Sequence, residues 1–135
     1  MIPPNPERPI RIGGKFEVEV ELKGDRTGVW SQALSLLDTG SQLNLLTFEK
    51  IKEMELTPTG RPAPAGHMYE GVPITLAGEY LKRVRVTDSS GTVKEIVQFF
   101  YGCKPMGYDI ILGTPWLATH CGCYDWAAAW WKYTT

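Results

Sequence analysis

The sequence lacks the features that mark secreted and membrane-spanning proteins. It has three cysteines, an odd number without the spacing of a disulfide scaffold, and no Asn-x-Ser/Thr glycosylation site. Its apolar runs are far shorter than the roughly 20 residues that cross a bilayer, and its first residues do not resemble a signal peptide. These absences predict a soluble, cytoplasmic protein with reduced thiols and no membrane partner.

The sequence also lacks an excess of charge of either sign. Lysine and arginine number 14, aspartate and glutamate number 15, and the formal net charge is -1. Nucleic acids and anionic membranes, which attract proteins through charge, are therefore not expected as partners. The spacing of His67, His120, Cys121 and Cys123 fits no standard zinc pattern, so we expect neither a metal nor another cofactor.

A chain of 135 residues is long enough for one domain that buries a core without disulfides. The first nine residues contain four prolines and no periodicity, so residues 1–10 are expected to form a flexible leader. We assign residues 11–126 to the folded domain and residues 127–135 to a C-terminal tail or a segment at a dimer interface.

Most of the chain has the pattern of strands. Apolar and charged residues alternate over residues 16–22, which predicts a strand with one buried face, and residues 29–37 return as a second strand. The other predicted elements are strands at 80–87, 92–101 and 108–112, a helix at 48–55 with Thr47 as N-cap, and a helix opened by Thr114 as N-cap and Pro115 at the first helical position. Because strand–helix–strand units do not alternate, we expect a mostly antiparallel all-β domain.

The second strand ends in an acid, Asp38, followed by Thr39, Gly40 and Ser41. An unpaired carboxylate is costly in an apolar setting, so something must satisfy it. An acid-Thr-Gly run alone is weak evidence, because an ordinary turn at a strand end is the default interpretation. The acid-containing turn at residues 88–91 lies between polar strand ends and is interpreted as a solvated hairpin turn, not as a second catalytic acid.

A second pattern downstream complements the acid turn. The string Tyr-Asp-Ile-Ile-Leu-Gly-Thr-Pro-Trp-Leu occupies residues 108–117, and a glycine-bearing hairpin is expected around residues 69–72. Together with residues 38–41, these segments resemble a retropepsin, the aspartic protease of retroviruses and retrotransposons. The string, with His120 and the Tyr-Asp-Trp of residues 124–126, is similar to the Ty3/gypsy branch in particular.

The resemblance implies a closed β-barrel with one or two short helices, and an aspartic endopeptidase that processes a polyprotein inside the cell or a virus-like particle. Such enzymes pair an ionised carboxylate with a protonated one, whereas this chain has a single acid-Thr-Gly motif. The second Asp38 must then come from another copy, so the predicted enzyme is a homodimer that binds an extended peptide.

The resemblance also implies roles for the residues of the acid turn. Thr39 would hydrogen-bond across the dimer axis and lock the two acid loops together. The Gly40 N–H would approach the carboxylates, and Ser41 would hydrogen-bond the outer oxygen of Asp38. Gly113 would pack under the acid loop as a structural residue.

The remaining assignments are less specific. Residues 69–74 would be the tip of a flap that closes over the peptide, or a plain surface hairpin. Three tryptophans near the end of the chain are expected to anchor the core or a dimer interface. The substrate-binding candidates are Leu43, Tyr69, Glu70, Gly71, Val72 and Ile111; Leu112 is a structural support beside Gly113; the tryptophans are Trp126, Trp130 and Trp131.

A rival hypothesis is a retropepsin-like module for dimerisation or protein binding, with little catalytic activity. It is favoured by residues 127–131, which do not clearly match the terminal strand that many retropepsins add to a shared dimer sheet. The intact run at residues 38–41 favours the enzyme.

Overall fold

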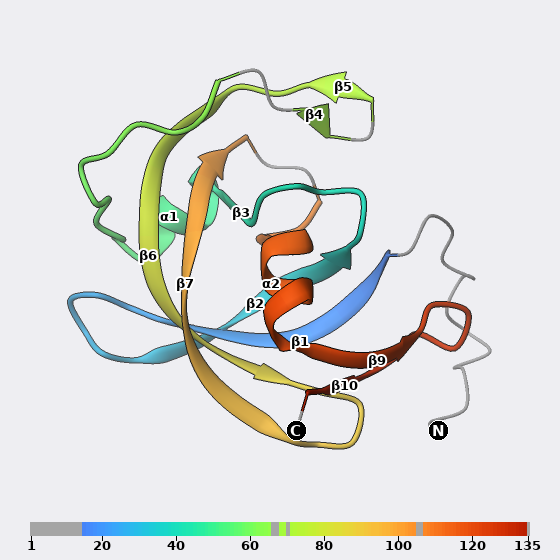
Figure 1. Cartoon of the computed structure of the whole chain (residues 1–135). Coiled ribbons are helices and arrows are strands. Elements are labelled where there is room, and N and C mark those ends of the chain that lie inside the picture. The colour runs from blue at the N-terminus through green and yellow to red at the C-terminus, as the bar shows by residue number, and fades with distance from the viewer. Residues whose placement is uncertain (1–14, 66–67, 70, 105–106, 135) are drawn as a thin grey trace.

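Six strands close into a barrel in a computed structural model that describes residues 15–65, 68–69, 71–104 and 107–134. The order around the barrel is β1-β2-β8-β3-β7-β6 (Figure 1). The predicted all-β fold with a closed barrel and two short helices is confirmed. The barrel strands are β1 (Lys15–Lys23), β2 (Trp30–Asp38), β3 (Leu45–Thr47), β6 (Leu76–Thr87), β7 (Val93–Cys103) and β8 (Ile110–Leu112).

Two of the six strand pairs are parallel, which the alternation pattern did not reveal. β8 runs parallel to β2, and β3 runs parallel to β7, while the other four pairs in the barrel are antiparallel. β3 and β8 have three residues each, and both are buried throughout. Such short strands, buried on both faces, show no period of two from which their neighbours could be inferred.

The barrel core is filled by the inward side chains of the first hairpin and of β6 and β7. In β1, Phe16, Val20 and Leu22 are at most 1% exposed, as the alternating pattern predicted. On β6 and β7, Val84 and Phe100 are fully buried in the same cluster. The first hairpin pairs all nine residues of β1 with β2, and this pairing brings the start of β1 beside Asp38.

The two helices are short and flank the barrel. α1 (Phe48–Glu53) begins after Thr47, whose side chain accepts a hydrogen bond from the Lys50 N–H at 3.4 Å, as expected of an N-cap. α2 (Thr114–His120) begins one residue earlier than predicted, because Gly113 is the N-cap and Thr114 is already helical. No side chain caps α2; the Thr114 N–H instead donates to the Ser41 carbonyl at 2.9 Å.

A C-terminal hairpin packs under the barrel of its own chain. β9 (Cys121–Asp125) and β10 (Trp130–Tyr133) form a separate two-stranded sheet. Trp131 is 2% exposed and lies 5.0 Å from Trp116 of α2, ring centre to ring centre. Trp131 and Tyr133 therefore belong to the core of the barrel, while the place of residues 127–135 at a dimer interface stays a prediction.

The turn between β6 and β7 corrects one expectation. Residues 88–91 do form a hairpin turn, but Asp88 is 5% exposed and not solvated. Its carboxylate accepts hydrogen bonds from the N–H groups of Ser90, Thr92 and Tyr133. Burial alone would raise the pKa of Asp88, but these hydrogen bonds and that of the Ser90 hydroxyl outweigh it and lower the pKa. The turn is thus the place where the C-terminal hairpin joins the barrel.

Two short strands, β4 (Met68–Tyr69) and β5 (Val72–Pro73), form the predicted hairpin above the barrel (Figure 1). The predicted leader, residues 1–10, lies outside the described residues, as does Glu70. No helix in the described part of the chain is long and apolar enough to cross a membrane.

Candidate active site

The acid loop begins where β2 ends. Asp38 is 3% exposed, whereas Thr39 and Gly40 at the tip of the loop are exposed. The Gly40 N–H donates to Asp38 Oδ1 at 2.8 Å, and the Ser41 N–H donates to the Asp38 carbonyl at 3.2 Å. The loop therefore keeps the Asp38 side chain buried next to two exposed residues.

Ser41 makes a different hydrogen bond from the one expected. Its hydroxyl donates to the Leu43 carbonyl at 2.7 Å. A hydroxyl has one hydrogen to donate, so the Ser41 hydroxyl is not available as a donor to Asp38 in this geometry. Ser41 is fully buried, and its hydrogen bond to the Leu43 carbonyl connects two positions within the loop.

Gly113 lies against the acid loop from below. A Cβ at this position would be 2.6 Å from the Leu43 carbonyl oxygen and closer still to that of Ser41. Any side chain would push the loop away, because real Cβ atoms do not approach backbone so closely. Leu112, just before it, is fully buried in the barrel core.

Asn44 is a buried polar residue that the sequence reasoning missed. It is 3% exposed, and its side chain joins three segments of the chain. Its Oδ1 accepts from the Gly113 N–H at 2.9 Å, and its Nδ2 donates to the Phe99 carbonyl at 3.2 Å. The only sequence signal was a polar residue inside the apolar run of residues 43–46.

Asp109 fixes the strand that carries Gly113. Its Oδ2 accepts from the Leu34 N–H at 2.9 Å, and its own N–H donates to the Leu34 carbonyl at 2.7 Å. These two bonds hold the start of β8 against the middle of β2. The acid of the Tyr-Asp-Ile-Ile-Leu-Gly string therefore has a structural task.

An apolar cluster lies on the same side of the sheet as the Asp38 side chain. Strand side chains alternate, so Leu36 and Asp38 face the same side of β2. Leu36 pairs with Ile111 in register, and both pack with Leu45. Leu43 packs against this cluster and is half-buried, so the structure brings together two of the predicted substrate-binding residues, Leu43 and Ile111.

Within one chain, other side chains cover this apolar cluster. Ile111 is 1% exposed and cannot touch a substrate unless its cover moves. The cover consists of half-buried residues around the cluster, among them Ile74 and Leu76, which follow the β4–β5 hairpin. Val72 is 59% exposed and lies on β5 of the β4–β5 hairpin, outside this cluster. Gly71 is exposed at the turn of the hairpin, where its φ of 77° suits a glycine.

A buried carboxylate ties the loop before the β4–β5 hairpin to the barrel. Glu79 is 6% exposed, and its Oε1 accepts from Thr59 Oγ1 at 2.9 Å and from Arg61 Nε at 2.7 Å. Its Oε2 accepts from the Tyr101 hydroxyl at 3.2 Å. Burial would raise the pKa of Glu79, but these hydrogen bonds and the Arg61 charge outweigh it and lower the pKa. Sequence offered no signal for this network.

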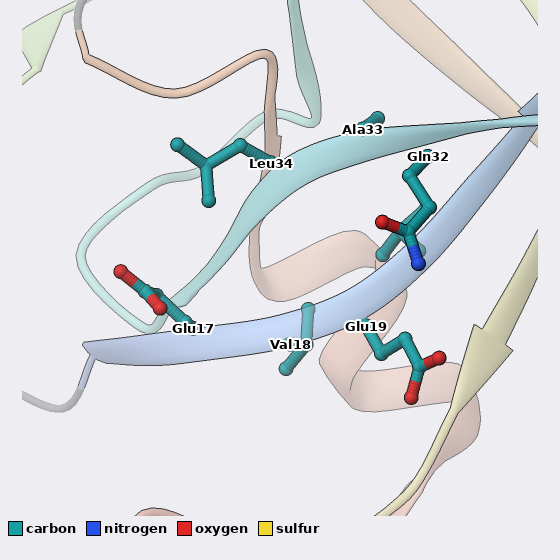
Figure 2. Close-up of a pocket in the computed structure, with 7 residues that line it drawn as sticks. Glu17, Val18, Glu19, Gln32, Ala33 and Leu34 are labelled. Atoms are coloured by element: carbon teal, nitrogen blue, oxygen red, sulfur yellow. The ribbon is translucent and has the colours of Figure 1, made fainter.

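A groove on the outer face of β1 and β2 lies apart from the acid loop (Figure 2). Its volume is about 290 Å³, and Figure 2 shows Glu17 and Glu19 on β1 beside Gln32 and Leu34 on β2. Leu34 is 51% exposed and lies four residues before Asp38. Among the described residues, no group of three or more His, Cys, Asp or Glu side chains is placed to hold a metal ion.

The chain matches no protein-family model, and no curated protein matches its sequence. Its structure is similar to the crystal structure of the retroviral protease-like domain of Ddi1 from Leishmania major. The two share 16% sequence identity, the match covers 77% of each chain, and the TM-score is 0.49. A similarity of this size assigns no role to any residue, so the roles of Asp38 and its neighbours rest on the chain's own sequence and geometry.

Proposed function

We propose that the chain is a retropepsin-like domain, and that two copies form an aspartic endopeptidase to which each contributes Asp38. The observation that carries the proposal is the buried Asp38 carboxylate at the end of β2, held by the N–H of Gly40, which is itself exposed. Such a loop presents an acid to an approaching molecule while keeping it out of bulk water. Polyprotein processing, an intracellular location and a Ty3/gypsy lineage belong to this proposal and rest on the resemblance of residues 108–126.

The chemistry requires two carboxylates at close range. One is ionised and takes a proton from water as the water oxygen attacks the peptide carbonyl carbon. The other is protonated and gives its proton to the carbonyl oxygen. The tetrahedral intermediate then breaks its C–N bond. The protonated carboxyl gives its proton to the leaving nitrogen, while the ionised carboxylate takes a proton from one hydroxyl of the intermediate, which becomes the carbonyl of the new acid and leaves the pair with one proton. Two like charges so close share one proton and titrate as a unit.

The apolar cluster under the acid loop supplies a surface for substrate side chains. Leu36, Leu45 and Ile111 face the same side of the sheet as Asp38. An extended peptide that displaces the residues at the foot of the flap would bring its own apolar side chains onto this cluster. We therefore propose a preference for apolar residues on either side of the cleaved bond.

The test compares the native chain with Asp38→Asn in cleavage of a mixture of fluorogenic peptides between about pH 4 and pH 7. The isosteric amide keeps an oxygen for the Gly40 N–H, so the fold should persist while cleavage falls to background. Glu19→Gln, an exposed carboxylate on β1, is the matched control and should cleave normally. Equal cleavage by the native and Asp38→Asn chains would exclude the mechanism.

A mixing experiment tests the shared site directly. If each dimer needs two intact acids, adding an equal amount of Asp38→Asn chain to a fixed amount of native chain should lower activity to about half after subunit exchange, because random pairing leaves half as many native dimers. A site contained within one chain would keep its full activity.

A further inference from the structure

An apolar patch lies on the outer face of β6 and β7. Leu81 of β6 pairs in register with Phe99 of β7, and Val97 lies on the same side of β7 as Phe99, because residues two apart in a strand share a face. All three side chains are 40–49% exposed. At one end of the patch, the Arg61 guanidinium lies 5.2 Å from the centre of the Phe99 ring. Single exposed apolar residues are ordinary, whereas neighbouring ones mark a surface that contacts another molecule.

The connection between β1 and β2 turns part of this patch into a groove. Residues 24–28 stand beside Leu81 and Val97 and line with them a groove of about 600 Å³, within the range of roughly 300–1,000 Å³ found for ligand pockets. Figure 1 shows this connection extending outward past β6. It is anchored by Asp25, whose Oδ2 accepts from Lys82 Nζ at 2.6 Å. The groove therefore has an apolar floor and a fixed wall.

The charged side chains that line the groove are mostly positive. Lys23, Arg26 and Arg83 line it together with one carboxylate, that of Asp25. Lys82 already neutralises this carboxylate. The other groove, on the outer face of β1 and β2 (Figure 2), has no Lys or Arg in its lining. The two grooves therefore differ in sign, and this one favours an anionic ligand.

Two of these cations have carboxylate neighbours that leave their charge accessible. Arg83 and Arg85 share Glu95, at 3.0 Å and 3.9 Å, so two positive charges meet one negative charge there. Arg26 pairs with Glu55 at 3.0 Å, but both side chains are more than half exposed, and such pairs are weak. Carboxylates of a ligand can therefore compete for both arginines.

We propose that this groove binds an acidic, apolar segment of a partner protein, in which bulky apolar side chains are flanked by Asp or Glu. The apolar side chains lie on Leu81 and Val97, and the carboxylates face the cations at the rim. A folded sheet face meets residues 24–28 before it reaches the floor, so a single extended segment fits the groove and a second barrel does not. The groove uses no residue of the acid loop, so its role is independent of the proposed endopeptidase.

Fluorescence anisotropy with a labelled peptide tests the groove. The probe is the peptide Glu-Leu-Asp-Phe-Glu-Leu-Asp, and the protein is the full chain carrying Asp38→Asn, so that cleavage cannot interfere. The probe should bind with a Kd below about 100 µM at low salt, and added NaCl should weaken binding because it screens the charges. Two control peptides, one with Lys in place of every acid and one with Ser in place of Leu and Phe, should bind at least about tenfold more weakly.

Matched variants locate the binding. Arg83→Glu reverses a charge at the rim and should weaken binding at least about tenfold. Lys52→Glu makes the same change at an exposed cation of α1 outside the groove lining and should leave binding unchanged. Leu81→Thr combined with Val97→Thr removes the apolar floor with a residue suited to strands, and should weaken binding by a similar factor. Leu34→Thr, at an exposed apolar position of β2, is its control. Thermal unfolding should show all four variants folded.

The outcomes decide between occupants. Binding that is lost in both groove variants and kept in both controls supports the inference. Binding that survives in the groove variants, a Kd above about 1 mM, or equal binding of a control peptide overturns it. Displacement of the probe by a single-stranded DNA oligonucleotide also overturns it, because the groove would then bind polyanions in general.

Sedimentation tests a second copy as the occupant. If the groove variants lose a self-association that Lys52→Glu and Leu34→Thr keep, the groove is a contact between copies and the inference is wrong. Unchanged sedimentation of all four variants agrees with a separate partner. None of these measurements depends on peptide cleavage, so failure of the endopeptidase proposal and failure of the groove are distinguished.

Discussion

Asn44 Oδ1 accepts a hydrogen bond from the Gly113 N–H at 2.9 Å, and this contact joins the two halves of the sequence pattern. The acid run of residues 38–41 and the Ile-Leu-Gly of residues 111–113 are distant in sequence. In the fold, Asn44 follows the acid loop and Gly113 lies directly beneath it. The two motifs therefore occur together because each holds the other in place.

Replacing Asn44 should loosen the acid loop. Asn44→Ala leaves the buried Gly113 N–H without its partner and removes the part-buried bond to the Phe99 carbonyl, and the free energy of unfolding should fall by about 1–3 kcal/mol. Gln42→Ala, at an exposed neighbouring position, should change it by less than about 0.5 kcal/mol. Urea denaturation measures both, and equal stability of the two variants would contradict the role given to Asn44.

Adding a methyl group at Gly113 should strain the same loop. Gly113→Ala forces the carbonyls of Ser41 and Leu43 to move, at a cost of about 1–3 kcal/mol in the free energy of unfolding, and peptide cleavage should fall with it. Gly60→Ala is the control: it has a φ of 94° and open space around it, so it should cost about 1 kcal/mol and leave cleavage unchanged. Full cleavage by Gly113→Ala would show that the loop tolerates displacement.

Asp88 should make the C-terminal hairpin sensitive to acid. Its folded pKa lies below the ordinary value of 3.8, so the stability it contributes is fully present above that value and is lost as pH falls through the folded pKa. Asp88→Asn should therefore be less stable than the native chain at neutral pH, and the difference should shrink from about pH 5 to about pH 2. Thermal unfolding across this range measures it; a constant difference would argue against the carboxylate's role.

The three thiols should differ in reactivity. Burial raises the pKa of Cys103 to about 12 and, with the nearby Cys123, that of Cys121 to about 11, so both are almost wholly protonated near pH 8. Cys123 is exposed and should react with a maleimide first, followed by Cys121, with Cys103 reacting only on unfolding. Mass spectrometry of the labelled peptides gives the order, and early labelling of Cys103 in the folded chain would contradict its burial.

The sequence predicted the parts of the fold that depend on local pattern. The alternation in β1, the turn after it, the Thr47 cap and the acid at the end of β2 all depend on neighbours within a few residues. The parallel neighbours of β3 and β8 were missed, because three buried residues carry no period. The start of α2 shifted by one residue because packing at Gly113, and not a capping side chain, sets it.

The polar residues that support the site were the hardest to predict. Asn44, Glu79 and Asp88 resemble ordinary surface residues in sequence, and each is buried by partners from distant segments. Ser41 was expected to hydrogen-bond Asp38, but its hydroxyl donates to the Leu43 carbonyl. The hydrogen-bond partner of a buried polar side chain is set by the tertiary structure, which local sequence does not reveal.

The long loops closed by these contacts have a consequence for how the protein is made. Leu34 bonds to a residue 75 positions away, Asn44 to one 69 positions away, and Asp88 to one 45 positions away. During synthesis, the acid loop lacks its contacts with Gly113 until that residue has left the ribosome. The hydrogen bond from the Tyr133 N–H to Asp88 forms only after Tyr133 has followed. Folding should therefore be slow and should not be completed before residue 133 has left the ribosome, as is common for proteins rich in distant contacts. Until then, a nascent chain carries Asp38 in a loop whose supporting contacts are incomplete.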